Sequence, residues 1–153
     1  MSTPPAADTL LREAGLRVTQ PRLAVLSAVA EHAHADTDTV IEATREVLPT
    51  VSHQAVYDSL RTLTDAGLLR RIKPEGLVAR YETRRGDNHH HVVCRSCGAM
   101  ADVDCAVGEA PCLHASDDHG FVIDEAEVIY WGTCPSCARR TQQARESGED
   151  QHV

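Results

Sequence analysis

The sequence has few aromatic side chains with which to build one large core. Phe, Tyr and Trp make up only 3% of its 153 residues, although 42% of the residues are hydrophobic. Small domains bury a smaller fraction of their surface than large ones, and bound metals often compensate. The composition therefore favours two small, metal-stabilised domains over one large domain.

The sequence also lacks the segments that would take the chain out of the cytosol. The first 15 residues, MSTPPAADTLLREAG, contain no basic segment followed by an apolar run, as a secretory signal would. No stretch approaches the roughly 18 apolar residues of a membrane helix. We expect a cytoplasmic protein with no membrane partner, in which Cys-x-x-C pairs indicate metal ligands or redox motifs rather than structural disulfides.

Excess positive charge, a common mark of nucleic-acid binding, is missing as well, because the net charge is -8. The charge is unevenly divided, however. Residues 1–85 contain 11 basic and 11 acidic residues, whereas residues 86–153 contain 4 basic and 12 acidic residues. The N-terminal part is therefore neutral, and its net charge does not exclude DNA binding.

Helical periodicity runs from Thr9 to about Gly67. Three helix starts are predicted by capping residues or by proline, at Thr19–Pro21, Asp36–Thr37 and Ser52. The third helix, SHQAVYDSLRTLTDAGLL, places Val56, Leu60 and Leu63 on its inner face and ends near Gly67.

After this helix, the segments LLRRIK and LVARYETR predict two short strands joined by a tight turn at PEG. Helices followed by a basic β-hairpin are typical of a winged-helix domain, whose last helix enters the major groove. The basic residues on or beside the hairpin, which we expect to approach phosphates, are Arg70, Arg71, Lys73, Arg80, Arg84 and Arg85. A helical bundle with a solvated hairpin is the alternative.

The predicted fold class is α+β, with a winged-helix domain over residues 1–84 and a polar hinge over residues 85–88. A second, α/β domain is expected over residues 89–140, followed by a flexible tail over residues 141–153. In this domain we expect strands in HHHVVC and AMADVD, a helix around residues 107–119 and a long strand in FVIDEAEVIYWG.

Two Cys-x-x-Cys hooks predict a four-thiolate zinc site. The residues are Cys94, Cys97, Cys134 and Cys137. Four thiolates in two such hooks suit tetrahedral, structural Zn²⁺. Two redox dithiols are the alternative interpretation.

The three histidines before the first hook can be divided by strand geometry, because successive side chains point to opposite faces. His90 then shares a face with Cys94, whereas His89 and His91 lie on the other face, within reach of Asp102 on the next strand. Two imidazoles and a carboxylate suit Fe(II), Mn(II), Zn(II) or Ni(II). A solvent-exposed histidine run is the alternative.

Three segments, in this order, resemble the Fur (ferric uptake regulator) family of metal-dependent repressors. They are GLRVTQPRLAVL, VSHQAVYDSLRTLTDAGLL, and YETRRGDNHHHVVCRSCG with its downstream CPSC. The segments DNHHHVVCRSCGAMADVDCAVGEAPCL and DEAEVIYWGTCPSC are similar to the catalase-linked FurA/CatR-type branch of that family, which responds to peroxide or redox state.

The resemblance implies a homodimer that binds double-stranded operator DNA through the winged helix and dimerises through the C-terminal domain. It implies a regulatory Fe(II) or Mn(II) site, with Zn or Ni as other possible metals. The implied ligands are His34, Glu82, His89, His91 and Asp102. Because they come from both domains, metal binding could favour one domain orientation, as allostery requires.

The resemblance also assigns DNA contacts to the winged helix. The residues are Arg17, Ser52, Gln54, Tyr57 and Arg61. Tyr57 would contact a thymine methyl group, but it could equally pack in the core. Asp58 departs from the family pattern, in which many relatives have a basic or amide residue.

Two further features stay open. A third metal site in some relatives is matched by His90 and Glu109, but Ala126 occupies the position of its last ligand unless His114, His119 or Glu127 substitutes. Cys105 and Cys112 are surplus to the zinc site, so they are either a reversible redox pair or two small buried residues.

We therefore predict a metal-dependent repressor of catalase or other oxidative-stress genes, with no catalytic residues and no small-molecule substrate. Iron level, peroxide and thiol oxidation are competing signals. Glu82 argues against histidine oxidation by Fe(II) and peroxide, because the peroxide-sensing branch has Asp there. An iron sensor controlling uptake genes, a zinc-stapled interaction module and a metalloenzyme are the rival interpretations.

Overall fold

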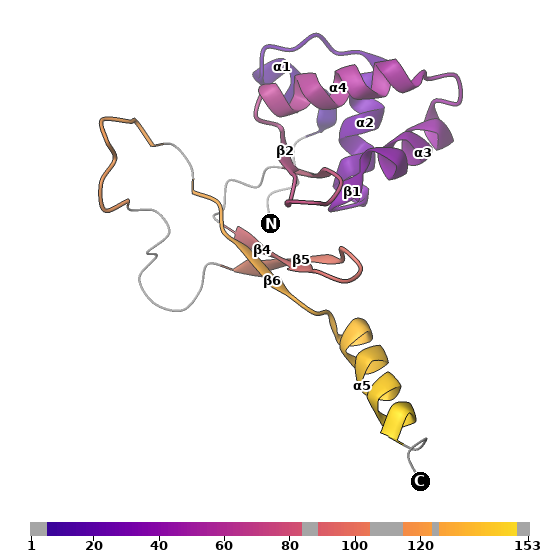
Figure 1. Cartoon of the computed structure of the whole chain (residues 1–153). Coiled ribbons are helices and arrows are strands. Elements are labelled where there is room, and N and C mark those ends of the chain that lie inside the picture. The colour runs from indigo at the N-terminus through magenta and orange to yellow at the C-terminus, as the bar shows by residue number, and fades with distance from the viewer. Residues whose placement is uncertain (1–5, 84–88, 105–114, 124–125, 150–153) are drawn as a thin grey trace. The chain divides into compact units, whose positions relative to one another are not determined.

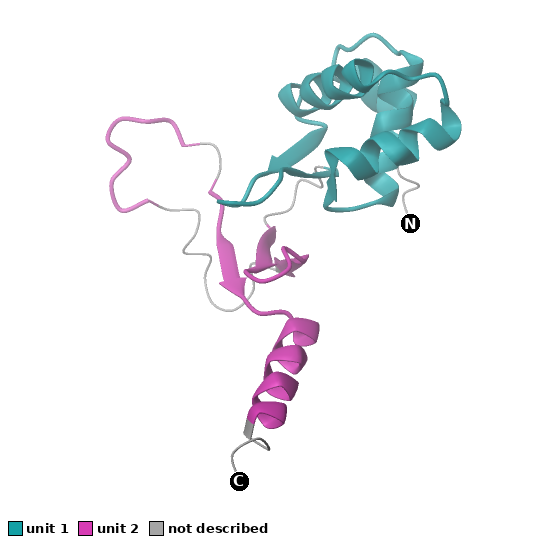
Figure 2. Cartoon of the chain, turned by 45° about the vertical axis from the view of Figure 1, so that its right-hand side comes forward, with its two compact units in different colours: residues 1–87 teal, residues 88–153 magenta. Residues whose placement is uncertain are grey.

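The structure is a computed structural model that describes residues 6–83, 89–104, 115–123 and 126–149. The chain divides into two compact units, residues 1–87 and residues 88–153 (Figure 2). The hinge predicted over residues 85–88 lies outside the described residues. None of the described helices is long and apolar enough to cross a membrane.

Four helices form most of the first unit: α1 (Ala7–Glu13), α2 (Gln20–Glu31), α3 (Thr37–Val47) and α4 (His53–Asp65) (Figure 1). The three predicted starts are confirmed, because the side chains of Thr19, Asp36 and Ser52 each accept a backbone N–H three residues on. These bonds satisfy donors that have no partner within the helix. Gly67 follows α4 with a φ of 77°, a conformation that glycine adopts without strain.

The apolar faces of these helices share one core. Val56, Leu60 and Leu63 point into it as predicted, and none is more than 1% exposed. They pack with buried residues of the other helices, of the sheet and of the connection before α4: Leu11, Val25, Leu26, Ala28, Val29, Ala35, Val40, Ile41, Val51, Leu69 and Tyr81. Because the inner side of α4 is packed in this core, the orientation of its exposed side is set.

The sheet of the first unit has three antiparallel strands in the order β1-β3-β2: β1 (Ala35–Asp36), β2 (Leu69–Ile72) and β3 (Arg80–Thr83). The two predicted strands pair as a hairpin, but the predicted tight turn was wrong, because residues 73–79 form a longer connection. Pro74 cannot donate to a strand ladder, and the Leu77 N–H donates to its carbonyl at 3.1 Å. Strand β1 was not predicted, since two residues are too few to show an alternating pattern.

The second unit contains β4 (His89–Cys94), β5 (Met100–Asp104), β6 (Ile129–Gly132) and α5 (Pro135–Glu149). Its sheet has the order β5-β4-β6, with β4 antiparallel to β5 and parallel to β6. The predicted strands in HHHVVC and AMADVD are confirmed. The long strand predicted over residues 121–132 is confirmed only at its end, as β6, because residues 121–123 and 126–128 are not in a strand.

The helix predicted around residues 107–119 lies largely outside the described residues, and its described end is not helical. There, the carboxylates of Asp117 and Asp118 accept the backbone N–H groups of His119 and Gly120, each at 2.8 Å. Such local bonds compete with helix formation.

The flexible tail predicted over residues 141–153 was wrong at its beginning, because α5 continues to Glu149. A hydrogen bond between side chains one turn apart supports this helix, because Gln142 Nε2 donates to Glu146 Oε1 at 3.4 Å. A polar segment can therefore be helical where side-chain pairs of this kind form.

Candidate metal centres and nucleic-acid interface

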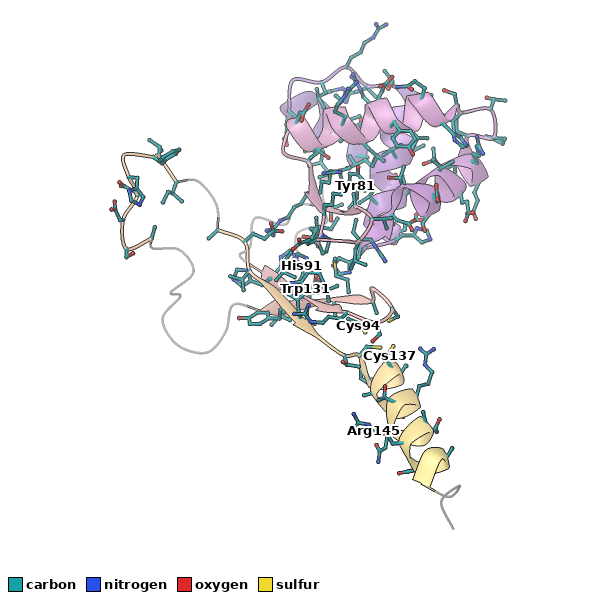
Figure 3. All side chains as sticks on the ribbon, viewed as in Figure 1. Tyr81, His91, Cys94, Trp131, Cys137 and Arg145 are labelled. Atoms are coloured by element: carbon teal, nitrogen blue, oxygen red, sulfur yellow. The ribbon has the colours of Figure 1, made fainter. Side chains whose placement is uncertain are left out.

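The four cysteines of the two hooks converge in the second unit. Cys94 ends β4, Cys97 follows it, and Cys134 and Cys137 lie immediately before and in the first turn of α5 (Figure 3). Their sulfur atoms all lie within 4.8 Å of one another, and Cys97 Sγ is 3.7 Å from Cys134 Sγ. Zn–S bonds of about 2.3 Å in a tetrahedron place sulfurs roughly 3.8 Å apart. The cluster therefore fits structural zinc.

Backbone N–H groups already point at two of these sulfurs. Cys94 Sγ accepts from the Cys134 N–H at 3.3 Å, and Cys134 Sγ accepts from the Cys137 N–H at 3.4 Å. The bonds from the Cys134 and Cys97 N–H groups lower the pKa of Cys94 to about 6. Hydrogen bonding with Cys134 and burial raise the pKa of Cys137 to about 12. Zinc would therefore have to displace protons when it binds, which makes its affinity depend on pH.

Two arginines support the hooks in ways that spacing did not reveal. Arg140 Nη2 lies 3.5 Å from Cys137 Sγ, one turn along α5. The guanidinium of Arg95 lies 5.1 Å from the centre of the Trp131 ring, and its backbone N–H donates to Gly132 at 2.9 Å. The first hook is thus attached to β6 as well as to β4.

On the other face of β4, the alternation predicted for the histidines is present. His91 is directly opposite Asp102 in the β4–β5 register. Asp102 Oδ1 lies 3.4 Å from His91 Nε2 and 3.7 Å from His89 Nε2. The two imidazole rings are 5.1 Å apart. One unit thus assembles two imidazoles and one carboxylate, a donor set suited to a divalent transition metal.

The first unit brings together the other two predicted regulatory ligands. His34 Nε2 lies 3.2 Å from Glu82 Oε2, and both side chains are largely buried. His34 has a φ of 62°, in the left-handed region that side chains other than glycine adopt infrequently. Its carbonyl accepts a hydrogen bond from Arg80 Nη1 at 3.1 Å, which holds this turn against β3.

Two arginines expected to approach phosphates have contacts inside the unit instead. Arg80 holds the His34 turn, and Arg70 Nη1 lies 4.0 Å from Glu82 Oε1 with a side chain that is 13% exposed. The contact between Arg70 and Glu82 could have been predicted from the sequence, because the two residues are opposite each other once the strands pair. Opposite charges at such positions favour pairing.

The remaining metal and redox candidates are only partly described. His90 is buried at 3% exposure, whereas Glu109 lies outside the described residues. The surplus cysteines, Cys105 and Cys112, also lie outside them. A third metal site and a redox pair therefore stay predictions.

Helix α4 presents the predicted DNA contacts on its outer surface. Tyr57 is 49% exposed, so it is not the core residue that was the alternative. Gln54 and Arg61 are exposed on the same helix, and Ser52 caps it by accepting the Ala55 N–H at 3.1 Å. Arg17 is exposed in the connection before α2, where its carbonyl accepts from Arg22 Nη1 at 2.8 Å.

A groove of about 300 Å³ runs along this surface of the first unit. Its walls come from α4 and from the sheet, and they are Gln54, Tyr57, Asp58, Arg61, Thr64, Asp65, Arg71 and Tyr81. A hollow with exposed amide, phenol and guanidinium groups can offer both hydrogen bonds and apolar contacts to base edges.

Comparison with known proteins gives consistent relatives over most of the chain. The model of the ferric uptake regulator family matches residues 13–131. The transcriptional regulator FurA of Mycobacterium tuberculosis is 67% identical over 138 residues, covering 90% of this chain and 94% of that protein. Ferric uptake regulation protein 1 of Mycolicibacterium fortuitum is 73% identical over 124 residues, covering 81% and 77%.

The solved structures with similar folds are regulators too. A ferric uptake regulator from Pseudomonas aeruginosa, solved with manganese, has a TM-score of 0.67 and 25% identity, covering 86% of this chain and 99% of that one. The Campylobacter jejuni peroxide stress regulator has a TM-score of 0.63 and 24% identity, covering 85% and 95%, and supports the fold. The predicted α+β class, with a four-cysteine cluster, is confirmed.

Proposed function

The chain belongs to the ferric uptake regulator family of metal-responsive transcriptional regulators, and from that premise we propose that it is a metal-dependent, redox- or peroxide-responsive repressor. It would bind operator DNA as a cytoplasmic homodimer and control catalase or other oxidative-stress genes. As predicted, it is a regulator and not an enzyme, because its close relatives are named as regulators. The same relatives argue against a zinc-stapled module that does not act on transcription.

The observation that carries this proposal is the pair of ligand groups already assembled in the two units. His34 and Glu82 form one group, and His89, His91 and Asp102 form the other. We propose that one Fe(II) or Mn(II) ion takes all five as ligands. His34 and Glu82 would add two ligands to the three of the other group, so an ion that takes both groups would favour one arrangement of the units and thus one DNA affinity.

Exposed apolar side chains support the proposed homodimer. Phe121, Val122 and Ile123 are 75%, 97% and 49% exposed, and Tyr130 on the edge strand β6 is 51% exposed. Three consecutive apolar side chains exposed to this degree are typical of interaction sites in soluble proteins.

The metal switch can be tested with one variant from each ligand group. A duplex selected from a random pool by Mn(II)-loaded wild-type protein serves as the probe, with and without Mn(II). His34→Ala and the double variant His89→Ala/His91→Ala should each abolish the stimulation by Mn(II) while the zinc content stays unchanged. His32→Ala, which removes an exposed histidine of the first unit that belongs to none of the proposed metal sites, is the matched control.

If both ligand variants retain the full Mn(II) stimulation, the switch assignment is wrong. If only one variant loses it, the five residues do not share one ion.

A second candidate function is control of iron uptake, which is favoured by the names of two relatives. Ferric uptake regulation proteins 1 and 2 of Mycolicibacterium fortuitum are 73% and 67% identical to this chain. Exposure of the Fe(II)-loaded protein to peroxide separates the two functions. An oxidative-stress regulator should release DNA at peroxide concentrations that leave total iron constant, whereas an iron sensor should release it only when iron is removed.

A further inference from the structure

Helix α4 carries an acidic residue on its outer surface, among the residues predicted to contact DNA. The side chain of Asp58 is 51% exposed and lies beside Tyr57 in the groove of the first unit. Its Oδ1 accepts a hydrogen bond from Gln54 Nε2 at 2.9 Å and another from Arg61 Nη2 at 3.2 Å. One carboxylate oxygen therefore holds two of the residues predicted to contact DNA.

These bonds restrict what Gln54 and Arg61 can offer to a ligand. An ionised carboxylate only accepts hydrogen bonds, so the amide nitrogen of Gln54 must face Asp58. The amide oxygen and the second N–H are then presented together, which is the arrangement that reads an adenine edge. Arg61, with a side chain 75% exposed, could otherwise turn freely towards any phosphate.

The charge of the groove is balanced rather than basic. Arg61 and Arg71 line it together with Asp58 and Asp65, so its formal charge is zero. Non-specific DNA binding depends on neutralising phosphates with Lys and Arg. A neutral groove with oriented hydrogen-bonding groups contributes little to such binding, but it can still distinguish base edges.

We propose that Asp58 is a specificity-determining residue that holds Gln54 and Arg61 in one arrangement and so trades DNA affinity for sequence selectivity. The inference rests on the proposed function, because it requires that α4 contacts DNA. Pairs three and four residues apart also stabilise a helix slightly. A purely helix-stabilising role would change the melting temperature and leave selectivity unaltered.

The test compares two duplexes: the one selected from a random pool by Mn(II)-loaded wild-type protein, and a scrambled duplex of the same composition. The ratio of the two dissociation constants and its salt dependence are measured for wild type, Asp58→Asn and Asp65→Asn. The last variant removes the same charge from the same groove but leaves the carboxylate that holds Gln54 and Arg61.

We expect Asp58→Asn to reduce the selectivity ratio by about tenfold, the effect of losing one oriented base contact. The slope of log affinity against log salt should steepen by about one unit on the scrambled duplex, because the released Arg61 gains a phosphate. This steepening should disappear when Arg61→Gln is combined with Asp58→Asn. Asp65→Asn should keep the wild-type ratio.

Full selectivity in Asp58→Asn would overturn the inference, and so would equal losses in Asp58→Asn and Asp65→Asn, since charge alone would then explain them. A wild-type protein that selects no duplex would instead overturn the proposed function, and the inference with it.

Discussion

The two units of this chain are stabilised internally by different kinds of side chain. The first buries 14 hydrophobic residues in one continuous core. Among the described residues of the second, the buried side chains are Val93, two cysteines and three histidines, while Phe121 and Val122 face solvent. Apolar burial can stabilise the first unit by itself, whereas the described part of the second contains more candidate metal ligands than buried apolar residues.

We infer from this difference that the stability of the second unit depends on metal binding more than that of the first. Zinc binding free energy is folding free energy when the site does not exist in the unfolded chain. The first unit needs no such contribution, because burial of a single leucine provides roughly 1.5–3 kcal/mol. Each unit should therefore respond to a different perturbation, and the single tryptophan, Trp131, offers a fluorescent probe of the second unit alone.

The largest effect is expected from removing a zinc ligand. Cys134→Ala leaves three thiolates, and structural zinc sites contribute about 10–16 kcal/mol of apparent binding free energy. We expect loss of zinc and of amide protection in β4 and β6, while the amides of α4 stay protected. Hydrogen exchange with zinc analysis would measure this, and Ser136→Ala inside the same hook is the control. Equal loss of protection in both units would show that they do not fold independently.

A cavity in the core of the first unit should destabilise the protein less than loss of zinc does. The effect should be confined to the first unit. Leu63 is fully buried in α4, and a Leu→Ala change in a core costs about 2–5 kcal/mol. Leu63→Ala should lower the midpoint of helix unfolding by circular dichroism. The Trp131 fluorescence transition and the zinc content should not change. Leu68→Ala, at a partly buried position beside the core, should cost less.

Replacing one buried residue of the first unit should increase the stability of the protein. Thr44 is fully buried in α3, and its hydroxyl has no hydrogen-bond partner among the described residues. Thr44→Val keeps the shape and removes the unsatisfied group, so we expect a gain of about 1 kcal/mol in the free energy of unfolding. Chemical denaturation would measure the gain. Unchanged or reduced stability would indicate that the hydroxyl is satisfied, for example by water.

The smallest effect concerns the cap of α3. The backbone N–H of Thr39 donates to Asp36 at 2.9 Å and lowers the pKa of this carboxyl below 3.8. The charged form is therefore favoured in the folded state. Its contribution is present above pH 3.8 and is lost as the pH falls through the lower, folded-state pKa.

Asp36→Ala should therefore cost about 1 kcal/mol at neutral pH, and less in acid. Asp36→Asn retains an equivalent cap and should flatten this dependence on pH, as measured by thermal unfolding from pH 2 to 6. If the stability of Asp36→Asn depended on pH as that of the wild type does, Asp36 would be excluded as the source of this dependence.

Local rules predicted the parts of the fold that local chemistry decides. Capping side chains marked the starts of α2, α3 and α4, and strand alternation placed His89 and His91 with Asp102. The convergence of four cysteines followed from their spacing. His34 could not be found this way, because a two-residue strand and a left-handed turn bring it to Glu82.

The other failures have a common physical cause. The apolar run FVI predicted a strand, but a strand needs a neighbour as well as a suitable pattern, and pairing in the described sheet begins only at Ile129. Conversely, the polar segment after Arg140 is helical, and a side-chain pair four residues apart contributes to this helix. Asp58 was noted only as a departure from a family pattern, since its two hydrogen bonds become visible only on a folded helix.

The parallel pairing of β4 with β6 has a consequence for how chains of this kind can diverge. The C-terminal ends of the two strands lie side by side, with Cys94 beside Gly132. The two cysteine hooks that begin at or follow these ends are therefore close together. Zinc bound to both hooks would close the chain between them into a loop, and doubling the length of a closed loop costs only about 0.6 kcal/mol. Insertions and deletions between β5 and β6 should therefore be tolerated, whereas the two residues inside each hook should not change in number.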